Sequence, residues 1–118
     1  AAAAHSCATG VGLLLQPEWL LVWGGWRSPC EPFFPAQGGV FHVLMAGLYL
    51  HAATSARRRW LLLPFIAVVK VTATVFLTSY VLFVKNIWMV SLSAAVDGLF
   101  AAAFVVLWSA RPRGEGGP

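Results

Sequence analysis

The chain has 118 residues, of which 59% are hydrophobic and 10% are charged, and its formal net charge is +4. Because soluble domains carry roughly 25% charged residues, this composition argues against a water-soluble fold and predicts a single integral membrane domain over residues 1–110. The basic residues lie at the ends of apolar segments rather than among aromatic residues on one face, so a nucleic-acid partner is not expected.

Residues 1–15 are apolar and are predicted to form the first of four transmembrane helices. The sequence begins without Met, which indicates a processed start or missing upstream residues. A Gln-Pro-Glu interruption follows, and residues 19–26 then contain three tryptophans. Because indole rings favour the headgroup level of a membrane, we expect an interfacial segment here. The alternative is one tilted span over residues 10–26 around Pro17.

A proline-rich segment precedes the second predicted helix. Residues 28–35 contain three prolines, which disfavour regular helix and predict an external Trp/Pro-rich loop. The second span is predicted over residues 37–55, about 19 residues and just long enough to cross. The two cysteines, Cys7 and Cys30, have no metal-ligand spacing, and the predicted topology places them on opposite sides, which disfavours a disulfide.

The last two spans are the most strongly apolar. They are predicted over residues 59–84 and 87–110, joined by a Lys-Asn turn, and Pro64 is expected to kink the first of them. The Pro/Gly-rich residues 111–118 are predicted to form a disordered tail.

Charge predicts the topology. If the three clear spans alternate, the five arginines at positions 57, 58, 59, 111 and 113 fall on one side, and Arg27 and Lys85 fall on the other. The arginine-rich side is then cytoplasmic, and both termini lie there.

Two opposite charges, Lys70 and Asp97, fall near the middle of neighbouring predicted spans. A charge at that depth costs about 2.5–3.5 kcal/mol, so both are expected to face protein and to pair. Their levels differ by about four residues, roughly 6 Å, and side chains that lean toward their own N-termini diverge here. Water or a third polar group is therefore an alternative bridge. The pair predicts either a proton or ion relay or an ion pair that fixes helix packing.

A relay needs further polar groups along the helices. The candidates are Thr74, Thr78, Tyr80 and Ser93. Hydroxyl groups of Thr and Ser also bond back to their own helix, so the same residues fit a purely structural role.

Small residues recur every four positions in the last span, at Ala94, Gly98 and Ala102, and predict a close helix-packing face. A looser version, Gly39, Val43 and Gly47, occurs in the second span.

The three histidines, His5, His42 and His51, are candidate haem or pigment ligands. His42 and His51 are separated such that they point in nearly opposite directions on one helix, so they cannot both ligate one haem. Two axial ligand sets stay open, His5 with His51 or His42 alone. The simpler alternative is that these histidines make ordinary hydrogen bonds.

Several short motifs together resemble small bacterial four-helix inner-membrane proteins of the DoxX-like kind. They are Pro17-Glu18-Trp19, Gly47-Leu48-Tyr49-Leu50, the arginine cluster with Trp60, Lys70, and Asp97-Gly98, within residues 10–109. The resemblance implies a fold and a location in the bacterial cytoplasmic membrane rather than an activity.

No nucleophile, phosphate-loop, metalloprotease or dinucleotide motif is present, so we expect no catalytic residues, no metal site and no enzyme. The sequence predicts a non-enzymatic accessory or structural subunit of a larger membrane complex, respiratory or photosynthetic, whose partners are membrane lipids and other integral membrane subunits. The alternatives are a small proton or ion transporter using Lys70 and Asp97, or a protein that binds lipid or another hydrophobic ligand. No cofactor is predicted, with lipid, haem or a chlorophyll-type pigment as the candidates to test.

Overall fold

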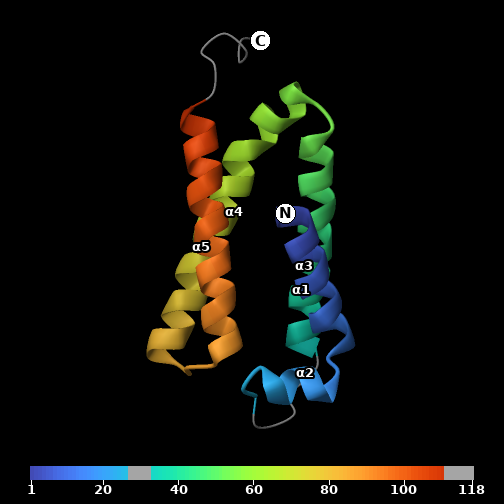
Figure 1. Ribbon diagram of the computed structural model, residues 1–118, viewed down its shortest axis with the longest axis vertical. Helices are drawn as coiled ribbons and strands as arrows, with labels where there is room; N and C mark the ends of the chain where they lie inside the picture. Colours follow the sequence, from blue (N-terminus) through green and yellow to red (C-terminus); the bar gives the residue numbers. More distant parts are fainter. Residues whose placement is uncertain (27–32, 111–118) are drawn as a thin grey trace. The chain divides into compact units, whose positions relative to one another are not determined.

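A computed structural model describes residues 1–26 and 33–110 of the chain. These residues form five helices, labelled in Figure 1, and no strand, as an all-helical prediction requires. The chain divides into two compact units, one over Ala1–Leu50 and the other from His51 onward. The first contains α1, α2 and most of α3, and the second contains the end of α3 followed by α4 and α5.

The prediction of four transmembrane helices is wrong. Within the described residues only α4 and α5 are long and apolar enough to cross a membrane. The first helix, α1, has 14 residues, whereas a span needs about 20. Helix α3 has 21 residues, but Gln37, His42 and His51 interrupt its apolar sequence. The four-helix transmembrane bundle is thereby reduced to two candidate spans.

In the first unit, α1 covers Ala2–Leu15 and α2 covers Glu18–Trp23. They are separate helices because Gln16 adopts the left-handed conformation, with φ 43°, and its N–H donates to the Gly12 carbonyl. Proline then follows, which disfavours continued helix in the preceding residue. One continuous span over residues 10–26 is therefore incorrect, and the tryptophan-rich segment begins as a short helix instead.

Two glycines allow α1 and α3 to cross closely within the first unit (Figure 1). A Cβ atom added at Gly10 would lie 2.9 Å from the Gly39 carbonyl oxygen. One added at Gly39 would lie 2.8 Å from the Gly10 carbonyl oxygen. Such distances are shorter than any side chain tolerates, so this backbone contact depends on glycine at both positions. Gly47, in contrast, has nothing within 4 Å of its added Cβ.

Helix α3 covers Phe33–Ala53 and thus begins four residues before the predicted start at residue 37. Pro35 lies in its first turn, where a helix needs no N–H donor and tolerates proline. The rest of the predicted external loop, residues 27–32 with Arg27 and Cys30, lies outside the described residues. Cys7 is exposed, with a free thiol.

A two-residue turn separates α3 from α4, which covers Ala56–Phe83. Ser55 caps α4, because its hydroxyl oxygen accepts a hydrogen bond from the Arg58 N–H at 3.2 Å. The preceding Thr54 donates its hydroxyl to the His51 carbonyl at 2.7 Å. The start of α4, at the end bearing the arginines, is therefore fixed by side-chain hydrogen bonds.

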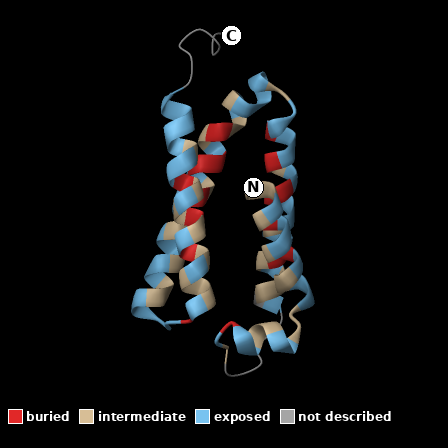
Figure 2. Cartoon of the chain, in the orientation of Figure 1, coloured by how far each residue is buried: buried red, intermediate tan, exposed pale blue. Residues whose placement is uncertain are grey.

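Helices α4 and α5 pack against each other as an antiparallel hairpin, which is the framework of the site (Figure 1). Helix α5 covers Trp88–Ser109, and the connection between the helices is four residues long, Val84 to Ile87. Pro64 lies inside α4 and cannot donate to the carbonyl of Trp60. Figure 2 shows few buried residues on either helix, so most of their surface is exposed and apolar.

Candidate functional site

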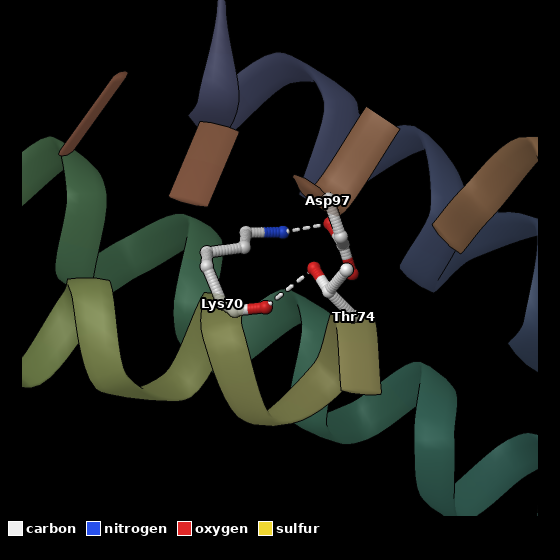
Figure 3. A network of polar contacts seen from close by, with 3 residues as sticks. All are labelled: Lys70, Thr74 and Asp97. Atoms are coloured by element: carbon white, nitrogen blue, oxygen red, sulfur yellow. Dashed lines mark hydrogen bonds and ion pairs between the residues drawn. The ribbon is translucent and has the colours of Figure 1, made fainter. Parts of the chain in front are cut away.

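The centre of the α4–α5 hairpin contains a buried ion pair. The Lys70 Nζ donates a hydrogen bond directly to Asp97 Oδ1 (Figure 3). Only 3% of Lys70 and 2% of Asp97 is exposed. The lysine stem spans the offset in level between the two residues, so the pair needs no bridging water or third residue. Charges so fully withdrawn from solvent are weakly screened, and each depends on the other.

Three neighbours shape the surroundings of the pair. The Phe100 ring lies one turn beyond Asp97, and its centroid is 5.7 Å from the Lys70 Nζ, within cation–π range. The Thr74 hydroxyl donates to the Lys70 carbonyl at 2.8 Å, which holds it on its own helix (Figure 3). Gly98 allows the close approach of α5, since a Cβ added there would lie 3.3 Å from the Thr74 methyl carbon.

A groove lies beside the ion pair on the same hairpin. Its volume is about 390 Å³, and its lining comes entirely from α4 and α5: Thr74, Thr78, Val81, Leu82, Ser91, Ala94, Ala95 and Gly98. It runs from the level of Thr74 and Gly98, next to the pair, toward the connection between the helices. The walls are apolar apart from three hydroxyl groups, so the groove suits a hydrophobic ligand or a few water molecules.

The candidate relay residues are distributed unevenly around this site. Thr74 and Thr78 line the groove, and Thr78 is exposed. Tyr80 and Ser93 are half-buried on α4 and α5, outside the groove lining. The structure thus brings two of the four side chains together beside the pair, and their role in a relay stays a prediction.

The buried face of α5 differs in part from the predicted small-residue face. Ala94 is buried and Gly98 contacts Thr74, but Ala102 is exposed. Ala101 is buried in its place, with Asp97 between it and Ala94. The buried face of α5 is therefore formed by residues at positions i, i+3 and i+7 of the helix. The predicted face used small residues four positions apart and so missed Ala101. Phe100 and the groove also went unnoticed in the sequence, although Phe100 lies three residues from Asp97.

The structure gives the exposure of each histidine in its own unit. His5 and His42 are half-buried, and the His42 ring contacts that of Phe41 edge-on with centroids 6.1 Å apart. His51 is exposed near the end of α3. No group of three or more His, Cys, Asp or Glu side chains gathers in the part of the chain that the structure describes. Pigment or haem ligation by His42 alone, or by His5 with His51, stays a prediction.

Comparison with known proteins gives no relative from which a function could be inferred. No family model, curated protein or solved structure matches this chain. The resemblance to DoxX-like proteins therefore stays a prediction, and the function has to be inferred from the site itself.

Proposed function

We propose that the protein is a non-enzymatic subunit of a larger membrane complex, held in the bilayer by the α4–α5 hairpin. The observation that carries this proposal is the distribution of polarity over the hairpin. Its two central charges neutralise each other in the interior, whereas its outward side chains are large and apolar, with Leu61 76% and Leu99 73% exposed. Such a surface is suited to lipid and to apolar faces of neighbouring membrane helices.

The orientation of the hairpin follows from its charges. Arg57, Arg58 and Arg59 begin α4, and Arg111 and Arg113 follow α5 in the sequence, whereas Lys85 is the cation of the connection. The positive-inside rule then places both outer ends of the hairpin in the cytoplasm. The proposed location is the bacterial cytoplasmic membrane, in a respiratory or photosynthetic complex.

Site-specific photo-crosslinking tests the subunit proposal. A photoreactive amino acid at Leu99, on the outward face of α5, should crosslink to other integral membrane proteins in native membranes. The matched control is Ala101, two residues away and only 6% exposed, where no intermolecular adduct is expected. Gentle purification should give a species larger than the 12.7 kDa chain. A lone, monodisperse chain with only lipid adducts at Leu99 would contradict the proposal.

A second function, translocation of protons or small ions, is favoured by one observation. The groove with its three hydroxyl groups begins beside the Lys70–Asp97 pair and extends toward one end of the hairpin. Ionisable pairs at membrane depth commonly mark ion pathways. Hydroxyl groups along the groove can hydrogen-bond a chain of water molecules that connects one surface to such a pair. In this second function, the groove would serve as the entry path on one side of the pair.

Flux into proteoliposomes distinguishes the two functions. Under translocation, Asp97→Asn should abolish flux of protons, and Thr78→Val should reduce it by removing a groove hydroxyl. The control, Thr72→Val, changes an exposed hydroxyl of α4 outside the groove and should leave flux unchanged. Equal flux in wild type and Asp97→Asn removes this second function and leaves the subunit proposal intact.

A further inference from the structure

Three consecutive arginines, Arg57, Arg58 and Arg59, lie exposed in the first turn of α4. Successive helical residues are rotated by about 100°, so three in a row fan over more than half of the helix circumference. This is broader than any single partner side chain could cover. The arginines therefore form a basic collar around the start of the helix, which we call the arginine collar.

Within the described residues of the second unit, no carboxylate is available to neutralise the collar. Asp97 is the only acidic residue in the described part of the second unit, residues 51–110, and it is bound to Lys70. Arg58 is instead held by a neutral group, because its Nη1 donates to the Thr54 hydroxyl oxygen at 2.9 Å. A guanidinium has five N–H donors, so this one hydrogen bond leaves Arg58 able to bind an anion.

The position of the collar relative to the tryptophans indicates its depth in a membrane. Trp60 directly follows Arg59 near the start of α4, and Trp108 lies near the end of α5. The helices are antiparallel, so both tryptophans lie at the same end of the hairpin, which indicates the headgroup level that indole rings favour. The collar then lies just beyond, at the level of the lipid phosphates.

We propose that the arginine collar binds the phosphate groups of anionic phospholipids in the leaflet at that end of the hairpin. Guanidinium groups bind phosphate through paired, charge-assisted hydrogen bonds, and juxtamembrane basic clusters attract anionic lipid. The opposite end of the hairpin has a single cation, Lys85, so the preference is confined to one leaflet. This inference rests on the proposed membrane embedding of α4 and α5, and it adds a specific lipid class as partner.

Native mass spectrometry of the full chain in detergent tests the proposal. The chain is titrated with phosphatidylglycerol or with phosphatidylcholine of the same acyl chains, and bound lipids are counted. The wild type should prefer phosphatidylglycerol, less strongly as salt rises. Each arginine removed should weaken binding about fivefold, so Arg57→Gln, Arg58→Gln and Arg59→Gln together should lose on the order of a hundredfold. The control, Lys85→Gln at the other end, should match wild type.

Two further measurements keep the outcomes distinct. The triple lysine variant at the same positions keeps the charge but not the paired hydrogen bonds, so it should bind more weakly than wild type and more tightly than the glutamine variant. Resistance to carbonate extraction from phosphatidylcholine vesicles measures insertion alone. If carbonate extracts the wild-type chain from these vesicles, the proposed membrane embedding is overturned. Insertion without a preference for phosphatidylglycerol, or equal binding by the glutamine variant, would overturn only the lipid proposal. If the collar retains an acidic protein but shows no preference for phosphatidylglycerol, the lipid proposal is overturned as well.

Discussion

Removing one partner of the Lys70–Asp97 pair should destabilise the hairpin more than removing both. In Asp97→Ala the Lys70 ammonium loses its counter-charge while it stays in an environment with almost no solvent contact. In Lys70→Met the Asp97 carboxylate is left in the same way. The double variant buries neither charge and leaves two apolar side chains at the helix contact. The three variants form a double-mutant cycle that isolates the pairwise interaction.

The magnitude follows from the burial of the pair. Both side chains are only 3% exposed, so water cannot replace the missing partner without opening the helix contact. Breaking such a buried pair costs about 3–5 kcal/mol, whereas replacing both charges by apolar groups is often neutral. The cost of placing one charge at membrane depth, about 2.5–3.5 kcal/mol, is of similar size. We therefore expect each single variant to raise the equilibrium constant for unfolding by roughly a hundredfold or more, and the double variant to approach wild type.

The assay is reversible unfolding of the full chain in mixed micelles, titrated with a denaturing detergent and followed by circular dichroism. The free energies of unfolding of the four chains give the coupling energy directly. A single variant that costs less than about 1 kcal/mol would show that the pair is hydrated or dispensable. A double variant as unstable as the single variants would show that the loss comes from packing rather than from an unpaired charge.

Two further predictions concern helix packing and capping. Gly10→Ala should destabilise the first unit by on the order of 1–3 kcal/mol, because the new Cβ meets the Gly39 carbonyl at 2.9 Å. The control Gly47→Ala, with open space around its Cβ, should be neutral or stabilising by about 0.5–1 kcal/mol. Thermal melting of both variants checks this prediction, and equal losses of stability would contradict it. Ser55→Ala should lower stability by about 1 kcal/mol, because α4 loses its cap. Ser55→Asp, which also caps a helix, should keep the stability of wild type. Melting curves in which both variants resemble wild type would argue against a capping role.

The sequence predicted the longest helices well and the breaks between elements less well. The two strongest apolar runs correspond to α4 and α5 with ends within a few residues, because length and hydrophobicity dominate there. The start of α3 was wrong because the predicted loop counted Pro35 as a helix breaker, whereas a first-turn proline is compatible with helix. The number of spans was wrong because α1 is too short and because Gln37, His42 and His51 interrupt α3, although both helices are apolar on average.

The candidate site was predictable in its members and not in its details. Opposite charges at similar depths in neighbouring spans indicated Lys70 and Asp97, and the structure brings these two side chains into direct contact. The backbone lean of the side chains suggested divergence, but it neglects the length and flexibility of lysine. The contact with Phe100 and the groove depend on helix rotation about the pair, which spacing alone does not determine.

The unequal lengths of the paired helices have a consequence for the thickness of the membrane that suits them. At 1.5 Å per residue, the 28 residues of α4 extend about 42 Å and the 22 residues of α5 about 33 Å, against about 30 Å of hydrocarbon. The short connection and the central ion pair prevent the two helices from sliding past each other, so the excess length lies at the beginning of α4. In the proposed membrane location, a thinner bilayer would tilt the whole hairpin or leave the first turns of α4 in water, so we expect the protein to favour thicker regions of the membrane.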